Sequence, residues 1–155
     1  GLGDVYKRQV IHQELNPNGE DLTMGEVVGS INEYSKGKAI VVTDVGQHQM
    51  ISCRYAKFKQ TRSLITSGGL GTMGFCLPAA IGAKFAAPNR EVIAIIGDGG
   101  FQMTMQELGT IFQTKTPVKI VVLNNDFWAW SANGRSYFLT SVMPLPHWLI
   151  LIFSK

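Results

Sequence analysis

Cysteine is scarce in this sequence of 155 residues, which contains only Cys53 and Cys76. The two thiols form no CxxC pair and have no histidine at ligand spacing, so neither a disulfide framework nor a structural zinc site is predicted. The longest apolar run, residues 148–153, is far shorter than the roughly 20 residues of a membrane helix. The N-terminus has no apolar signal region. These absences favour a cytoplasmic protein without a membrane span.

A strong charge of one sign is also absent. Lys and Arg together number 14 against 11 Asp and Glu, which gives a formal net charge of +3. The basic residues are dispersed along the chain, so nothing indicates a nucleic-acid partner. The hydrophobic fraction of 45% is typical of a globular protein. We therefore expect one compact domain with a buried core.

Local patterns predict the first elements. The T-x-x-E pattern of Thr23 and Glu26 predicts a capping box at the start of a helix over residues 23–34. A buried strand is expected over residues 39–43, followed by a polar loop at 44–50. The apolar face of the predicted helix comprises Val27, Val28, Ile31 and Tyr34.

Glycine residues are clustered in the middle of the chain, before the segment with the clearest predicted structure. After the cluster of Gly68, Gly69, Gly71 and Gly74, a small-residue helix is expected over residues 78–87. A β-α-β crossover then follows, with apolar strands at 92–96 and 118–123 around a helix at 101–112. The predicted inner stripe of that helix comprises Met105, Leu108, Ile111 and Phe112. The predicted fold is α/β, a doubly wound, mostly parallel sheet with helices on both faces, here incomplete.

Two polar residues follow the strands of this crossover. Asp98 and Asn125 are 27 residues apart and should converge at the carboxyl edge of the sheet. A carboxylate and an amide oxygen suit Mg²⁺ that phosphate oxygens also hold, and the turn at residues 97–100 offers N–H groups to those phosphates. The spacing alone does not distinguish this metal site from a structural alternative, in which Asp98 caps a helix and Asn125 begins a turn.

Two other hypotheses are less favoured. Residues 69–74 satisfy G-x-G-x-x-G, the dinucleotide-binding pattern. That pattern should follow a strand directly and open a helix, but residues 66–68 intervene and Pro78 starts the helix later. His48 could ligate a metal, but no second histidine or cysteine stands at ligand spacing.

Three strings together resemble a known family. GDGGFQMTMQELGTIFQTKTPVKIVVLNN is similar to the GDG-to-NN signature of thiamine-diphosphate enzymes. VVTDVGQHQM and TSGGLGTMGFCLPAAIGAKFAAP resemble acetolactate synthase large subunits. The resemblance covers about residues 23–127, with the three motifs in the right order. It implies the C-terminal thiamine-diphosphate-binding domain of such a subunit.

The resemblance implies a role for each matching residue. Mg²⁺ would be held by Asp98, Asn125 and the backbone carbonyl of Phe127. Met73 would lie beneath the cofactor and hold its two rings in a bent form, with Gly71 contacting the same ring, whereas Asp44 would only close its own loop. Without the family, core packing would be the favoured role of Met73. The residues expected around the diphosphate are Gly46, Gln47, His48, Gly97, Asp98, Gly99, Gly100 and Asn125.

The parent enzyme implied by the resemblance is a transferase of isoleucine and valine biosynthesis. It decarboxylates pyruvate and joins the product to a second 2-oxo acid. The activating glutamate and the FAD site lie in other domains, so no catalytic residue is expected here and the chain alone should be inactive. A homodimer or tetramer and a regulatory small subunit are implied partners. The alternatives are another thiamine-diphosphate carboligase, decarboxylase or oxidase, or a non-catalytic phosphate- or nucleotide-binding module.

Both ends of the chain depart from this family. Residues 1–9 resemble translated adaptor sequence, and the domain is expected over residues 10–127. After Phe127 the family continues with a string such as FLGMVRQWQ, and deleting one nucleotide from its coding sequence yields FWAWSANGR, which is residues 127–135. Residues 128–155, which contain no Asp or Glu, are therefore interpreted as a frameshifted tail. The alternative is a divergent tail whose tryptophans pack.

Overall fold

The computed structural model describes residues 23–124 and, for the backbone only, residues 138–145 and 148–154. Within the described residues, helices and strands alternate from α2 to β3, two helices then precede β4, and β5 and β6 follow. The helices are α2 (Met24–Ser35), α3 (Gln47–Tyr55), α4 (Cys76–Ala86), α5 (Asp98–Thr104) and α6 (Glu107–Thr114). The strands are β1 (Ile40–Thr43), β2 (Leu64–Thr66), β3 (Val92–Gly97), β4 (Lys119–Leu123), β5 (Phe138–Leu145) and β6 (Trp148–Ser154).

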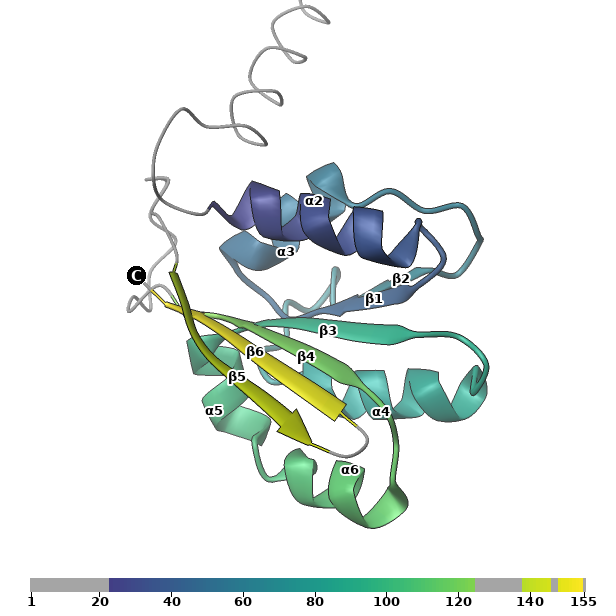
Figure 1. The fold of residues 1–155 in the computed structure, drawn as a ribbon, viewed down its shortest axis with the longest axis vertical. Helices are drawn as coiled ribbons and strands as arrows, with labels where there is room; N and C mark the ends of the chain where they lie inside the picture. The colour runs from purple at the N-terminus through teal and green to yellow at the C-terminus, as the bar shows by residue number, and fades with distance from the viewer. Residues whose placement is uncertain (1–22, 125–137, 146–147, 155) are drawn as a thin grey trace, which may run out of the picture.

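The strands form one sheet in the order β2-β1-β3-β4-β6-β5. All neighbouring pairs are parallel except β5 and β6, which are antiparallel. Helices α2 and α3 lie on one face of this sheet, and α4, α5 and α6 lie on the other (Figure 1). The predicted α/β fold with a mostly parallel sheet covered on both faces is confirmed.

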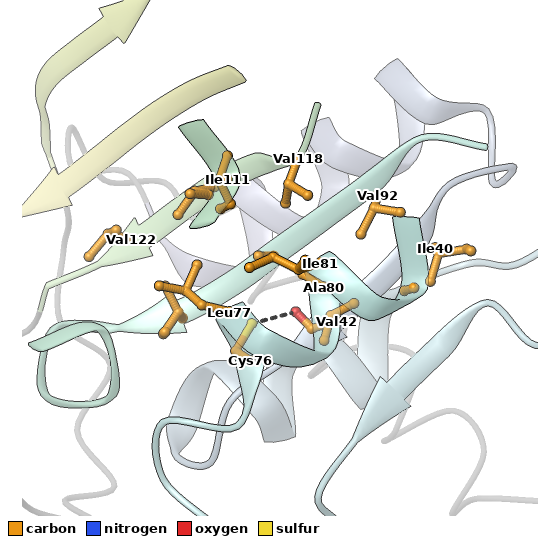
Figure 2. Close-up of a cluster of buried hydrophobic side chains, with 14 residues drawn as sticks. Ile40, Val42, Cys76, Leu77, Ala80, Ile81, Val92, Ile111, Val118 and Val122 are labelled. Carbon is orange, nitrogen blue, oxygen red and sulfur yellow. Dashed lines mark hydrogen bonds between the residues drawn. The ribbon is translucent and has the colours of Figure 1, made fainter. Parts of the chain in front are cut away.

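Each face of the sheet has its own apolar core, because successive strand residues point to opposite sides. Under α2 and α3 the core includes Val28, Ile93 and Ile95. Under α4 it includes Leu77 and Ile96, and Figure 2 shows that cluster. Since the central strands contribute to both cores, they are continuous apolar runs, as the sequence predicted.

Helix α2 begins where the sequence predicted. Thr23 Oγ1 accepts a hydrogen bond from the backbone N–H of Glu26 at 3.2 Å, and the Glu26 carboxylate accepts one from the N–H of Thr23 at 2.7 Å. Both halves of the capping box are therefore present. The predicted apolar face was wrong at Tyr34, which is 60% exposed.

Three expectations about the elements are corrected. The polar loop predicted at 44–50 ends early, because α3 begins at Gln47. The helix predicted at 101–112 is two short helices, α5 and α6. Its predicted inner stripe holds for Ile111, which is buried, and partly for Leu108, but Met105 and Phe112 are 54% and 72% exposed.

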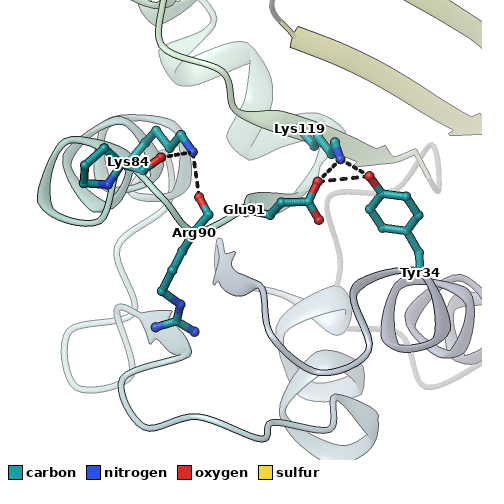
Figure 3. Close-up of polar contacts among 6 residues, drawn as sticks. Tyr34, Lys84, Arg90, Glu91 and Lys119 are labelled. Carbon is teal, nitrogen blue, oxygen red and sulfur yellow. Dashed lines mark hydrogen bonds and ion pairs between the residues drawn. The ribbon is translucent and has the colours of Figure 1, made fainter.

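Polar contacts join the elements at the amino edge of the sheet (Figure 3). Tyr34, at the end of α2, donates a hydrogen bond to Glu91, and Lys119 of β4 contacts both side chains. Lys84 donates to the backbone carbonyl of Arg90 at 2.6 Å. These contacts fasten α2 and α4 to the strands at the edge opposite the site described below.

The predictions for residues 1–9 and for the side chains beyond 124 lie outside the described residues. Strands β5 and β6 fall within the segment interpreted as a frameshifted tail, and their backbone extends the sheet beyond β4. In the part of the chain that the structure describes, no helix has the length and apolar character to cross a membrane.

Candidate functional site

The candidate site lies at the carboxyl edge of the parallel strands. Asp44 directly follows β1 and Asp98 directly follows β3. Gly97 stands level with Leu123 in the register of β3 and β4, so Asp98 lies beside the end of β4. Asn125 and Phe127, the other two predicted metal ligands, are outside the described residues. Their convergence with Asp98 stays a prediction.

His48 is enclosed at this edge by two glycines. A Cβ atom on Gly46 would lie 3.0 Å from His48 Cε1, and one on Gly97 would lie 3.1 Å from the same atom. The imidazole therefore fills space that side chains at these glycines would need. This contact brings together three of the predicted site residues, from α3, from the loop before it and from the end of β3.

The His48 ring is buried, and one of its two nitrogen atoms is hydrogen-bonded. It hydrogen-bonds the backbone carbonyl of Asp44, whereas its Nε2 atom has no hydrogen-bond partner among the described residues. Burial lowers the pKa of His48 to about 4, and the bond to the Asp44 carbonyl acts in the opposite direction. His48 is therefore neutral near pH 7 and carries an unpaired ring nitrogen beside the end of β3.

Asp44 links three segments that are distant in sequence. Its side chain is fully buried; Oδ1 accepts the N–H of Val45 at 3.0 Å and Oδ2 accepts the N–H of Gly74 at 2.9 Å. A Cβ atom on Gly100 would lie 1.9 Å from Oδ2, so α5 can approach the carboxylate only because residue 100 is glycine. Burial raises the pKa of Asp44, and hydrogen bonds from the backbone of Gly74, Val45 and Phe75 lower it.

The sequence suggested that Asp44 only closes its own loop. In the structure Asp44 does more than that. The bond to Val45 is that local closure, but the bond to Gly74 spans 30 residues. Sequence reasoning missed this role. The available signal was an acidic residue placed directly after a buried strand, at the edge where site residues of parallel sheets gather.

The glycine loop, residues 68–74, leads from β2 towards α4. Gly71 and Gly74 have positive φ angles of 62° and 82°, which favour glycine. Met73 is 41% exposed in this loop, and Leu70 is 92% exposed. Met73 is thus an accessible apolar side chain at the site edge, which argues against the core-packing role.

Two features of this edge are available to a ligand. A Cβ atom on Gly71 would meet nothing within 4 Å, and the Nε2 atom of His48 lacks a partner within the described residues, whereas His48 and Asp44 fill the space beside Gly46, Gly97 and Gly100. In those same residues, no group of three or more His, Cys, Asp or Glu side chains could hold a metal. The predicted metal set, in which Asp98 is the single side chain of these types, stays a prediction.

The family model described as the C-terminal TPP binding domain of thiamine pyrophosphate enzymes matches residues 44–141. The chain belongs to this family. Thiamine pyrophosphate is the same compound as thiamine diphosphate, so the predicted family and its cofactor are confirmed.

The chain is similar in sequence to acetolactate synthase large subunits. It is 54% identical over 109 residues to that of Lactococcus lactis, a match that covers 70% of this chain and 19% of the relative. It is 46% identical over 114 residues to the isozyme 3 large subunit of Escherichia coli, covering 74% of this chain and 20% of the relative. The chain thus spans about a fifth of the length of these relatives.

Proposed function

We propose that the chain is the thiamine-diphosphate-binding part of an acetolactate synthase large subunit. Such an enzyme decarboxylates pyruvate and joins the product to a second 2-oxo acid, a step of branched-chain amino-acid biosynthesis. The observation that carries the proposal is the meeting of His48 with Gly46 and Gly97 at the carboxyl edge of the sheet. The identity of 46% to 54% to such subunits supports the same conclusion.

The diphosphate would bind between the loop after β1 and the first turn of α5. Gly46 and Gln47 would meet it from one side, and Gly97, Gly99 and Gly100 would let the backbone approach from the other. Because the neutral ring donates through Nδ1 to the Asp44 carbonyl, Nε2 is an acceptor, and His48 would donate from Nε2 to a phosphate oxygen only after taking up a proton, which the phosphate charge would favour. A buried ring nitrogen without a partner is costly, so a ligand that satisfies it is favoured at this position.

Mg²⁺ would be held by Asp98 together with Asn125 and the backbone carbonyl of Phe127. Asp98 would provide the anionic oxygen, and the two neutral oxygens suit a hard cation that also binds phosphate. Met73 would support the cofactor rings from below, with Gly71 offering backbone contact. Thiamine diphosphate supplies the electron sink for decarboxylation, while these residues bind and orient it.

The complete enzyme would need parts beyond this chain. The activating glutamate and most of the FAD site would come from other domains, and the subunit would form a homodimer or tetramer in the cytoplasm. A regulatory small subunit is a further partner. The isolated chain would bind cofactor without turnover.

The reading frame is part of the same proposal. Residues 1–9 would be translated adaptor, residues 10–127 the domain, and residues 128–155 a frameshifted tail. Resequencing the coding DNA from the codon of Asn124 onward tests this. A missing base that restores a string such as FLGMVRQWQ supports the frameshift. Confirmation of the present frame refutes the frameshift, and thiamine-diphosphate binding by this chain must then be shown before any enzymatic role is assigned.

Titration calorimetry of the chain with thiamine diphosphate tests the binding function. We expect binding that requires Mg²⁺, that EDTA abolishes and that Asp98→Asn weakens. A phosphate- or nucleotide-binding module would instead bind ADP equally well and would ignore a Met73→Ala substitution. No binding of thiamine diphosphate at millimolar concentration would refute the proposal.

A further inference from the structure

We propose that Asp44 is a positioning residue, whose carboxylate holds the glycine loop against the first turn of α5 and so sets the height of Met73 beneath the cofactor. This inference rests on the proposed function, because it assumes that the cofactor rings lie over Met73. It assigns to Asp44 a role in orienting the cofactor and no contact with it.

The geometry limits what can occupy this position. The backbone N–H groups of Val45 and Gly74 point at the two oxygens of one fully buried side chain, and the backbone of Phe75 adds a third hydrogen bond. A carboxylate accepts at both oxygens, whereas an amide presents a donor at one of them and would face an N–H group. Bonds to an ionised acceptor are also stronger than neutral ones. The site therefore selects an acid over its isosteric amide.

The hydrogen bond between Gly74 and Asp44 restrains the segment that contains Met73. The hydrogen bonds from Gly71 N and Thr72 N go to Ser67, at 2.9 Å and 3.1 Å, and so shape the start of the loop without attaching it to the sheet. The bond from Gly74 N to Asp44 attaches its end to β1. Because Met73 immediately precedes Gly74, a fixed Gly74 amide restricts where Met73 can stand.

Asp44 also packs closely against α5. The close approach of Gly100 to Asp44 Oδ2 leaves no room for a side chain, so the carboxylate, the loop end and the first turn of α5 pack as one unit. A Cβ at Gly74 would likewise lie 2.9 Å from Thr104 Cγ2 of α5. The parts proposed for the diphosphate and for the rings are thereby held in register through one buried acid.

Hydrogen exchange of the unmodified chain is the first test. The amide of Gly74 should exchange about tenfold or more slowly than that of Leu70 in the same loop, since one is bonded to a buried acid and the other is exposed. Equal exchange at the two amides would overturn the proposal. This measurement needs no variant and no cofactor, so it stands even if the proposed function fails.

The second test compares two ligands, thiamine diphosphate and inorganic pyrophosphate, each with Mg²⁺. Asp44→Asn should speed exchange at Gly74 and weaken thiamine diphosphate binding about tenfold, the factor expected for one lost charged hydrogen bond. Pyrophosphate lacks the rings and should bind within about twofold of the unmodified chain. Asp98→Asn should weaken both ligands, and Glu33→Gln, an exposed loss of the same charge, should change neither.

The outcomes separate the two proposals. Unchanged exchange at Gly74 in Asp44→Asn, or faster exchange with unchanged thiamine diphosphate binding, overturns the positioning role. An equal loss of both ligands assigns Asp44 a merely structural role and also overturns it. If Asp44→Asn does not fold, Gly100→Ala replaces it in the exchange test, because the added methyl must displace the carboxylate from Gly74. If the unmodified chain binds neither ligand, the proposed function fails.

Discussion

At the scale of single residues, His48 combines burial with a ring nitrogen that has no hydrogen-bond partner in the described part of the chain. Its environment keeps the imidazole neutral, because burial penalises the charged form more than the bond to the Asp44 carbonyl favours it. In the unfolded chain the same imidazole has a pKa of about 6.5. The difference between the two states makes stability depend on pH.

We predict that stability falls as the pH drops from about 6.5 towards 4. In this window the unfolded chain takes up a proton at His48 and the folded chain does not, so unfolding is favoured. The loss due to His48 should approach about 3 kcal/mol near pH 4. The raised pKa of Asp44 acts with the opposite sign, gaining stability as the pH falls.

Urea denaturation between pH 7 and 4 of the unmodified chain and of His48→Gln isolates the histidine effect. The contribution of Asp44 is common to both proteins and cancels in their difference. The gap in unfolding free energy should shift in favour of His48→Gln at low pH. Parallel pH profiles would show that His48 is not buried as a neutral group.

At the scale of elements, the start of α2 depends on Thr23. We predict that Thr23→Ala lowers the free energy of unfolding by about 1 kcal/mol, because the N–H of Glu26 loses its acceptor. Ser30→Ala, at an exposed position inside the same helix, should change it by less than about 0.5 kcal/mol. Thermal unfolding of both variants provides the measurement. Equal effects would mean that the cap contributes nothing.

The elements also show where sequence patterns suffice. Helix α2 and strands β1, β3 and β4 were predictable, because a capping box and unbroken apolar runs are local signals. Helix α3 was missed since its buried residues are His48, Ser52 and Tyr55, which form no apolar stripe. The break between α5 and α6 was missed because Met105 belongs to an apolar period yet lies exposed at the junction.

In the candidate site, too, some residues could be predicted from local sequence patterns and others could not. Asp98 and the glycines beside it were predicted from a short motif that follows a predicted strand, whereas Gly46 and Gly71 were predicted from the resemblance to the family. The contact of Asp44 with Gly74 and Gly100 joins three separate motifs. Such contacts depend on how strands are ordered in the sheet, and no local pattern in one motif encodes them.

At the scale of the whole molecule, one sheet separates two cores that share its central strands. We predict that Leu77→Ala on one face and Ile93→Ala on the other each lower the free energy of unfolding by about 2–5 kcal/mol. Each change should shift a single transition, because neither layer has a sheet of its own. Urea unfolding followed by far-UV circular dichroism and by tyrosine fluorescence checks this. Separate transitions for the two probes would contradict it.

The buried Cys76 thiol, whose sulfur donates to the backbone carbonyl of Val42 at 3.2 Å (Figure 2), has a practical consequence. The sequence contains one other cysteine, Cys53, which is exposed on α3. A maleimide dye should therefore label the native chain once, and gain its second site only when α4 leaves the sheet. The rate at which the second label appears, followed by mass spectrometry, therefore measures how often α4 separates from the sheet.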